Sequence, residues 1–266
     1  MKLALKTFLA KNALKINLDI KLTNSKKTVD KFITSIRPLQ TEIDLVRIGG
    51  EKDGGYLVPN DFQGIEGCFS PGVGNSISFE EELAQLGIQS YLVDYSVYEL
   101  PSKNNKITFE RNFLGYSDEP HFITLSQWIN KYQPNSNNLI LQMDVEGAEY
   151  EILQKCTISD LKRFRFMVIE FHSFHKIIYK REFVEIKKSL DRILNEFYVV
   201  HAHINNGDES FNWHSDFIPK TLELTFIRKD RVKKVTKHAT IPHSLDCKNN
   251  HFMPDNPLPN VWKSST

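Results

Sequence analysis

Carboxylates and a histidine follow two stretches of the sequence that are typical of buried strands. Asp144 and Glu146 come after the mostly apolar residues 139–143, and Glu170 and His172 end a second, mostly apolar stretch. Ligands of open α/β sheets bind beyond the carboxyl ends of the strands, so these side chains are expected at one edge of a sheet. Carboxylates and an imidazole there could take a proton from a hydroxyl group or hold a divalent cation.

Each of these side chains also has a structural explanation. A helix is expected to begin near Ala148, and Asp144 or Glu146 could cap its free backbone amides. His172 alone could be a hydrogen-bonded core histidine. With Glu170 on the same strand face, however, converging carboxylates and an imidazole must be hydrogen-bonded, protonated or bound to a metal ion. The sequence leaves these alternatives open.

A glycine turn with an acid downstream predicts a nucleoside-binding site. Residues 65–87 are expected to form a strand, a turn containing Gly72 and Gly74, and then a helix. Asp94 ends the next predicted strand, at roughly the 20-residue separation expected for a carboxylate that binds a ribose. The third glycine of the dinucleotide-binding pattern is missing, so a plain tight turn is the alternative.

Further polar residues are expected at the ends of the last strands. Such hydrogen-bonding groups suit sugar hydroxyls, although a polar strand end that faces water is the simpler explanation. Alternation places His201, His203 and Asn205 on one strand face. Tyr56 could stack on a sugar or on adenine, but aromatic residues more often lie in the core. The candidate sugar-binding residues are Tyr56, His201, His203, Asn205, Asn206 and Glu223.

The order of the predicted elements indicates the fold class. Strands alternate with helices through five units, and two strands then follow without a helix between them. This order predicts an α/β domain with a mostly parallel sheet and one reversed strand. We expect a basic helical arm over residues 1–44, the main domain over 45–237, and a tail rich in Pro and Asn over 238–266 that wraps the surface.

Composition and charge exclude several classes of protein. The 266 residues carry a net charge of +1, which gives no overall attraction to nucleic acid. The three cysteines include no Cys-x-x-Cys pair, which argues against a disulfide framework or a zinc ribbon and favours a reducing compartment, the cytoplasm. Lysines interrupt the first 16 residues, so we expect neither a signal peptide nor a membrane span there.

The lysine-rich amino-terminal segment could carry a surface contact. Leu5, Phe8, Leu9, Ala13 and Ile16 share one face of an expected helix. That face would pack on the domain or, less favourably, on a membrane surface or on a second subunit to form a homodimer. We interpret the lysines as solvated helix faces, with contact to an anionic partner as the alternative.

Several segments, in the same order, resemble the FkbM-like methyltransferases that use S-adenosylmethionine. They extend over residues 45–230 and read VRIGGEKDGGYLVP, FSPGVGNSISFEEEL, YLVDYS, LQMDVEGAEYEIL, VIEFH, HAHINN and PKTLELTFIRK. The resemblance implies a Rossmann-like, seven-stranded methyltransferase sheet with helices on both faces, so that residues 45–237 would be a methyltransferase domain. It also implies that the methyl donor is bound by Gly72, Gly74, Asn75, Asp94 and Tyr95.

The resemblance further implies methylation of an oxygen, commonly a sugar hydroxyl of a polysaccharide, glycolipid or natural product. Methyl transfer is an in-line displacement, so the protein must align donor and acceptor and remove the hydroxyl proton. We expect Asp94 to hold the donor ribose and Glu146 or His172, beside Asp144, to take the proton. A divalent ion such as Mg²⁺ could bind Asp144 and Glu170. A nicotinamide-dependent oxidoreductase and a non-catalytic sugar-binding protein are the alternatives.

Overall fold

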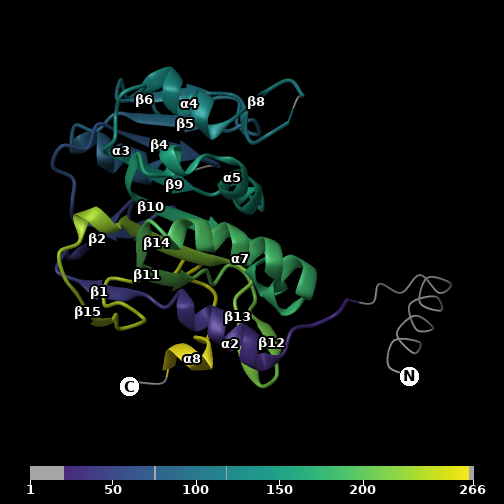
Figure 1. Ribbon diagram of the computed structural model, residues 1–266. Coiled ribbons are helices and arrows are strands. Elements are labelled where there is room, and N and C mark those ends of the chain that lie inside the picture. Colours follow the sequence, from purple (N-terminus) through teal and green to yellow (C-terminus); the bar gives the residue numbers. More distant parts are fainter. Residues whose placement is uncertain (1–20, 75, 118, 264–266) are drawn as a thin grey trace.

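A seven-stranded sheet forms the centre of the structure, a computed structural model that describes residues 21–74, 76–117 and 119–263 (Figure 1). In spatial order the strands are β11 (Phe197–Ile204), β14 (Leu222–Arg228), β10 (Phe164–Phe171), β9 (Leu139–Met143), β4 (Gly67–Pro71), β5 (Ser90–Val93) and β6 (Ile107–Glu110). β14 runs antiparallel to both of its neighbours, and the other neighbouring strands are parallel. The predicted mostly parallel, Rossmann-like sheet with one reversed strand is confirmed.

Part of the sequence-based prediction falls outside the described residues. The amphipathic helix of residues 5–16, the homodimer contact expected of it, and Asn75 all belong to this part. Within the described ranges, no helix combines the length and the apolar character required to cross a bilayer.

The central strands are buried along their whole length, and their sequences explain why. Every residue of β9 (LILQM) and β10 (FRFMVIEF) is buried. Near-continuous apolar runs are typical of parallel strands that are covered on both faces. Met143 at the end of β9 pairs with Ile169 of β10, so the polar residues that follow the two strands emerge at the same edge of the sheet.

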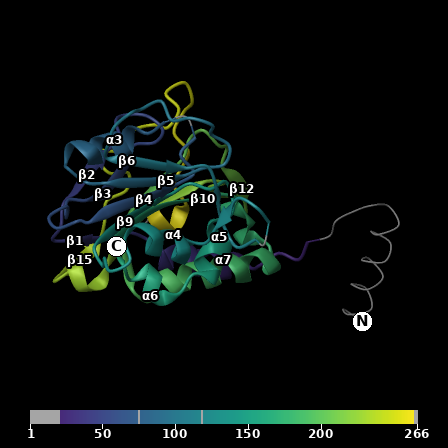
Figure 2. The ribbon, with the colours of Figure 1, turned by 90° about the horizontal axis from the view of Figure 1, so that it is seen from above.

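Two layers cover the sheet, and Figure 2 shows them on opposite sides of it. The larger apolar core joins the sheet to most of the helices. A smaller core joins the other face to α3 and an antiparallel hairpin, β2 with β3. Helices on both faces are therefore confirmed. The elements of these layers are α2 (Lys26–Ser35), β2 (Leu45–Ile48), β3 (Tyr56–Pro59), α3 (Ser78–Gln85), α4 (Leu125–Tyr132), α5 (Glu149–Lys155), α6 (Ile158–Leu161), the 3₁₀ helix Phe174–Ile178 and α7 (Lys180–Leu194).

Local sequence signals set the helix boundaries. The hydroxyl of Thr124 accepts a hydrogen bond from the N–H of Gln127 (3.2 Å), and the Gln127 side chain accepts one from the N–H of Thr124 (3.0 Å). This reciprocal capping box fixes the start of α4, whose Trp128 is then fully buried. α2 begins after a Ser25 cap and ends before Pro38, because the residue that precedes a proline is disfavoured in the helical conformation.

Residues 106–115 (KITFERNFLG) have the pattern of a single strand, but the structure divides them. β6 ends at Glu110, and a separate β7 (Phe113–Leu114) pairs with β8 (Phe122–Ile123). At the break, the guanidinium of Arg111 lies 4.3 Å from the ring centroid of Tyr95, and its Nε donates to the Tyr95 carbonyl oxygen (3.0 Å). The break thereby brings the β7–β8 pair to the edge where β5 ends.

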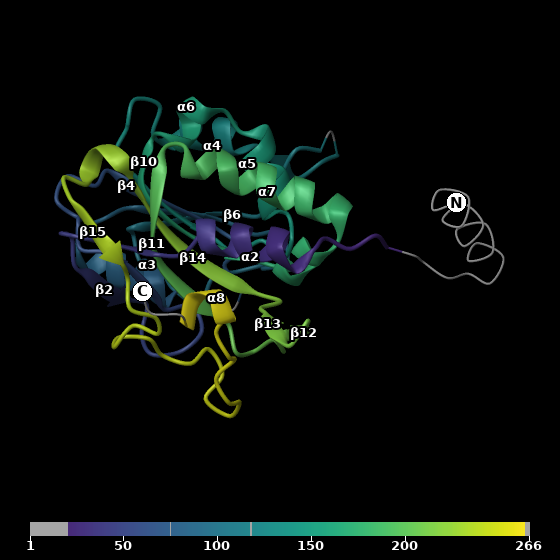
Figure 3. The same ribbon diagram turned by 60° about the horizontal axis from the view of Figure 1, so that its bottom comes forward.

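The carboxyl-terminal segment runs back along the body of the molecule. β15 (Val235–His238) pairs with β1 (Leu39–Thr41), and Figure 3 shows the yellow segment looping away before it reaches α8 (Asn260–Lys263) near α2. Trp262 is buried there, and its indole N–H donates to the carbonyl oxygen of Ile33 (2.9 Å). A short hairpin of β12 (Phe211–Trp213) and β13 (Asp216–Ile218) precedes β14.

Candidate active site

Gly72 allows the loop after β4 to approach the end of β9. Its φ of +80° lies in the left-handed region, and a Cβ atom on it would lie 1.4 Å from the carbonyl oxygen of Asp144. The Gly72 N–H donates to the Val93 carbonyl oxygen (3.0 Å), and the Asp144 N–H donates to that of Pro71 (3.1 Å). The ends of β4, β5 and β9 therefore meet at one point, which a side chain at residue 72 would force apart.

Asp94 lies directly beyond β5 and faces this glycine loop. Its Oδ2 accepts a hydrogen bond from the N–H of Gly74 (3.1 Å). Its Oδ1 accepts from the N–H (2.8 Å) and the hydroxyl (2.7 Å) of Ser96. The structure thus brings together the glycine turn and the acid that the sequence pairs. A carboxylate has further lone pairs, which can accept from the hydroxyls of a ribose.

A cavity of about 320 Å³ adjoins Asp94, and we call it the donor cavity. Its wall includes a row of rings, in which the Phe113 centroid lies 4.7 Å from that of Tyr95 and 5.1 Å from that of Phe122. Flat aromatic surfaces of this kind suit a purine base. The lining residues are Gly72, Gly74, Val93, Asp94, Tyr95, Ser96, Asn112, Phe113, Leu114, Phe122, Asp144, Val145, Glu146 and Ala148.

His172 lies at the centre of a group of four carboxylates. Its Nδ1 is 2.9 Å from Oε1 of Glu149. Its Nε2 is 3.7 Å from Oδ1 of Asp144, 3.4 Å from Oε2 of Glu146 and 3.8 Å from Oε1 of Glu170. The end of β9, the start of α5 and the end of β10 supply these groups. The four residues that the sequence predicts at this edge are therefore brought together.

Glu149 is a site residue that sequence reasoning misses. It is fully buried in the first turn of α5, and besides His172 it accepts hydrogen bonds from the N–H groups of Val145 (3.3 Å) and Gly147 (3.0 Å). The signal that could have identified it is a third carboxylate, three residues after Glu146, in the first turn of the predicted helix. Such a side chain meets the free amides that precede the helix.

Glu146 points away from the helix that follows it. The residue before α5, Ala148, makes no side-chain cap, so neither Asp144 nor Glu146 has the capping role that was the structural alternative. Glu146 has a φ of +53°, a left-handed conformation that is uncommon for a residue with a side chain. Its side chain is 86% exposed. This turn delivers a free carboxylate to the sheet edge, and backbone strain of this kind is concentrated at functional sites.

A second cavity, of about 510 Å³, opens beside the first, and we call it the acceptor cavity. Asp144 and Glu146 line both cavities, so the two meet at these carboxylates. The tail supplies part of the wall, including Phe252, which is 98% exposed. The lining residues are Lys52, Asp53, Asp144, Glu146, Glu170, His172, Asn205, Gly207, Asp208, Asn249, Asn250, His251 and Phe252.

Burial and crowding change the proton affinities of the cluster. Burial raises the pKa of Asp144 to about 7, against the opposing effect of His172. Burial, Glu223 and Asp144 together raise the pKa of Glu170 well above its usual value. Burial acts to lower the pKa of His172, but Glu149 and the other carboxylates outweigh it and raise that pKa to about 9. An imidazole that keeps its proton at neutral pH is a poor proton acceptor.

Some residues predicted from the last strands reach the acceptor cavity. Asn205 does so directly, since its Nδ2 donates to Oε1 of Glu170 (2.9 Å). Two other predicted residues, His203 and Glu223, contact Asn249 of the tail. Oδ1 of Asn249 lies 3.0 Å from Nε2 of His203, and its Nδ2 donates to Oε1 of Glu223 (2.7 Å). His203 and Glu223 therefore position a residue of the cavity wall without lining it themselves.

Three other predicted sugar-binding residues do not line the acceptor cavity. Tyr56 is 4% exposed, and its hydroxyl accepts from Nε2 of Gln142 (3.3 Å). His201 is buried with its Nε2 2.9 Å from Oδ1 of Asp246. Asn206 donates from its amide to three carbonyl oxygens of the tail. These contacts are with segments far away in the sequence, which strand alternation could not specify.

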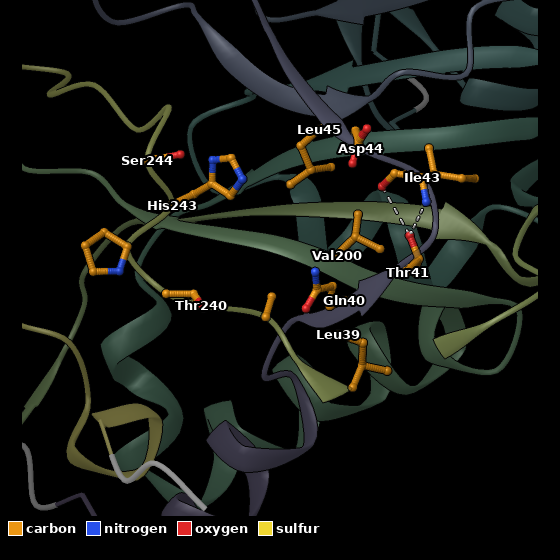
Figure 4. Close-up of a pocket in the computed structure, with 12 residues that line it drawn as sticks. Leu39, Gln40, Thr41, Ile43, Asp44, Leu45, Val200, Thr240, His243 and Ser244 are labelled. Carbon is orange, nitrogen blue, oxygen red and sulfur yellow. Dashed lines mark hydrogen bonds between the residues drawn. The ribbon is translucent and has the colours of Figure 1, made fainter. Parts of the chain in front are cut away.

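A separate hollow of about 390 Å³ lies between β1, the start of β2 and the tail (Figure 4). Figure 4 shows Thr41 turned toward Ile43, whose N–H donates to the Thr41 hydroxyl (3.2 Å) and whose carbonyl oxygen accepts from it (3.3 Å). Nδ1 of His243 accepts from the N–H of Leu245 (3.1 Å). Because these groups serve local turns, we assign the active site to the donor and acceptor cavities.

Asp246 and the two histidines beside it, His201 and His203, form what we call the tail clasp. Burial acts to raise the pKa of Asp246, but the two histidines outweigh it and hold that pKa below its usual range. Burial acts to lower the pKa of His203, but Glu223 and Asp246 outweigh it and raise that pKa to about 9. Burial, against the effect of Asp246, lowers the pKa of His201.

The clasp gives a predicted pH dependence for the tail. The stabilisation from His203 is complete below its unfolded pKa of about 6.5 and is lost as the pH rises to about 9. The stabilisation from Asp246 is complete above its unfolded pKa of about 4 and is lost only as the pH falls below that value. We therefore expect hydrogen exchange of residues 240–252, corrected for the intrinsic rate, to quicken between pH 6 and pH 9.

Asp246→Asn should remove most of the pH dependence of hydrogen exchange in the tail. It should also lower the free energy of unfolding at pH 6 by about 1–3 kcal/mol. Asp255→Asn is the matched control, since the Asp255 carboxylate is 71% exposed in the same tail. The explanation fails if the tail exchanges equally at both pH values, or if Asp246→Asn keeps the parent's pH dependence.

Residues 72–203 match the family model described as the methyltransferase FkbM domain. This range contains the glycine loop, Asp94 and the whole cluster of carboxylates around His172. A search of curated proteins found no match.

Solved structures with a similar fold include the following two. The fibrillarin/Nop5p complex matches 61% of this chain and 72% of that chain, at 14% identity and a TM-score of 0.37. A magnesium protoporphyrin IX methyltransferase from Synechocystis PCC 6803, with bound SAH, matches 63% of this chain and 77% of that chain, at 14% identity and a TM-score of 0.33. The family match and the strand order carry the assignment: residues 72–203 form a methyltransferase domain of the FkbM type.

Proposed function

We propose that this methyltransferase transfers the methyl group of S-adenosylmethionine to a hydroxyl group of a sugar. The observation that carries the proposal is the meeting of two cavities at Asp144 and Glu146. One cavity has the glycine loop, the Asp94 carboxylate and aromatic walls that suit a nucleoside. The other is open and polar, as a hydroxylated acceptor requires. Methyl donor and acceptor would then face each other across the shared carboxylates.

The acceptor oxygen attacks the methyl carbon, the carbon–sulfur bond breaks, and S-adenosylhomocysteine leaves. The hydroxyl proton passes to Glu146, whose exposed carboxylate lines both cavities. Of the two proton acceptors expected from the sequence, His172 is less suitable because its pKa is raised to about 9. Asp144 stays at the junction, and a divalent ion held there with Glu170 would lower the pKa of the acceptor hydroxyl.

Several features of the acceptor cavity support a sugar as the acceptor. The side-chain amides of Asn205, Asn249 and Asn250 can both donate to and accept from hydroxyl groups. Phe252 presents an exposed ring at the wall, against which a sugar ring could pack. A polysaccharide, a glycolipid and a natural-product glycan all offer these groups, so the proposal extends to this class of acceptor.

Calorimetry with S-adenosylmethionine is the direct test of the donor. We expect binding by the parent protein and a loss of affinity of about 10- to 100-fold in Asp94→Ala, because charge-assisted hydrogen bonds to the ribose disappear. Ser96→Ala is the control, since it removes one partner of Asp94 and leaves the carboxylate in place. It should lose far less affinity.

Binding of a nicotinamide dinucleotide in place of S-adenosylmethionine would instead support the oxidoreductase that the sequence left open. Donor binding without turnover on any glycan of a broad panel would favour a non-catalytic sugar-binding protein. Turnover is measured as release of S-adenosylhomocysteine.

A further inference from the structure

The imidazole of His172 is held in one orientation by a buried carboxylate. Nδ1 lies 2.9 Å from Oε1 of Glu149, which already accepts from the N–H groups of Val145 and Gly147. A carboxylate oxygen that accepts hydrogen bonds requires Nδ1 to be the donor, so Nδ1 carries a proton. The other ring nitrogen, Nε2, consequently faces the acceptor cavity. Carboxylate–histidine pairs of this kind orient metal-binding histidines in many proteins.

Carboxylates converge on Nε2 without forming hydrogen bonds to it. Asp144, Glu146 and Glu170 approach to 3.7, 3.4 and 3.8 Å, which exceeds normal hydrogen-bond lengths. Oδ1 of Asp144 and Oε2 of Glu170 are buried and have no hydrogen-bond partner. Leaving such groups unpaired costs free energy, and the Glu170 side chain is only 5% exposed. These carboxylates therefore lack a partner that a cation beside Nε2 would supply.

We propose that a divalent transition-metal ion, best matched by Mn²⁺, binds Nε2 of His172 together with the carboxylates of Asp144 and Glu170, with Glu146 beside them. The ion would displace the proton that Nε2 carries in its absence. Ligands of one ion lie roughly 3 to 3.5 Å apart when the bonds are about 2.1 Å long, so the separations of the carboxylates from Nε2 need to contract by less than about 1 Å. Asn205 orients Glu170 by donating to Oε1, the oxygen that lies 3.8 Å from Nε2, and Oε2 has no hydrogen-bond partner.

The imidazole determines the kind of metal. Mg²⁺ requires oxygen ligands in a near-ideal octahedron, whereas imidazole is a ligand for transition metals and carboxylates also suit Mn²⁺. The choice of Mn²⁺ over the Mg²⁺ expected from the sequence follows from Nε2 facing the carboxylates. The proposal refines the cation of the proposed function, where the ion would polarise the acceptor hydroxyl, but binding of the ion itself can be measured without donor or acceptor.

Electron paramagnetic resonance with Mn²⁺ as the probe tests the site on the full chain after removal of metal by a chelator. Free Mn²⁺ gives a six-line signal that is lost on binding, and pulsed spectra detect the nitrogen of a coordinated imidazole. We expect one ion per chain, a nitrogen coupling, and displacement of Mn²⁺ by Mg²⁺ only at a large excess. Glu170→Gln should weaken binding by about 10-fold or more, and His172→Gln should abolish the nitrogen coupling.

Glu149 is a positioning residue in this scheme. Glu149→Gln should reduce the nitrogen coupling and the affinity for Mn²⁺ by about 10- to 100-fold, a change that a merely structural role would not produce in a folded variant. Asp208→Asn is the matched control, since Asp208 lines the same cavity outside the cluster and should leave both readouts unchanged. Binding of S-adenosylmethionine by each variant verifies that the domain is folded.

Two results would overturn the metal site: an Mn²⁺ signal unaltered by excess protein, or binding that Glu170→Gln and His172→Gln leave unaltered. If Mn²⁺ bound in a way that depends on Glu170 but showed no nitrogen coupling, His172 would not be a ligand. The argument for Mn²⁺ over Mg²⁺ would then fail. Methyl transfer by chelator-treated protein would leave the methyltransferase intact while rejecting the ion, so the two proposals fail separately.

Discussion

Gly72→Ala is expected to abolish binding of S-adenosylmethionine and to destabilise the domain by at least about 3 kcal/mol. The new methyl group would lie 1.4 Å from the carbonyl oxygen of Asp144, a backbone atom that cannot turn away. Relief requires the end of β9 to separate from the loop after β4, and the donor cavity lies between them. Calorimetry and thermal unfolding measure the two effects.

Gly74→Ala is the control for Gly72→Ala, because it introduces backbone strain without steric overlap. Gly74 also has a positive φ, +54°, but a Cβ atom there would meet nothing within 4 Å. This variant should pay only the cost of about 1–2 kcal/mol for a left-handed alanine and should retain donor binding. If Gly72→Ala instead resembled Gly74→Ala in both measurements, the close approach of the loop to β9 would not be what forms the donor cavity.

Glu146→Gln is expected to lower kcat by about 10²- to 10⁴-fold while the affinity for S-adenosylmethionine changes little. The variant keeps the size of the side chain and removes its ability to take the acceptor proton. Since the Glu146 side chain is 86% exposed, the unfolding free energy should change by less than about 0.5 kcal/mol. The rate is measured as S-adenosylhomocysteine release with the glycan that best supports turnover by the parent protein.

Asp208→Asn serves as the control for this experiment, because it neutralises another carboxylate of the acceptor cavity away from the donor. It should leave kcat within a few-fold of the parent value. A Glu146→Gln variant with parent-like kcat would remove Glu146 from the mechanism. A large loss in both variants would indicate that the overall charge of the cavity matters and that no single base does.

The sequence predicts those parts of the site that depend on neighbouring residues. Gly72 and Asp94 follow consecutive strands of a parallel sheet, so the fold necessarily brings them together. Asp144 and Glu170 are predicted for the same reason, because their strands β9 and β10 are adjacent and parallel. Buried apolar runs also suffice for the sheet itself and its reversed strand.

Other features depend on contacts that no local pattern encodes. Glu149 belongs to the site because the turn at Glu146 and Gly147 places its carboxylate against His172. His201 and Asn205 share a strand face, yet their partners differ. His201 contacts Asp246 of the tail, whereas Asn205 contacts Glu170. Strand alternation specifies the face but not the partner that covers it.

Because mostly different segments of the chain line the two cavities, the acceptor cavity can change while the donor cavity stays the same. The donor cavity is lined by residues 72–148, whereas residues 249–252 of the tail close the acceptor cavity. The tail crosses β11 and is fixed there by the clasp, and it takes no part in the donor wall. Insertions or exchanges between residues 247 and 256 could therefore alter which molecule is methylated without loss of the methyl donor.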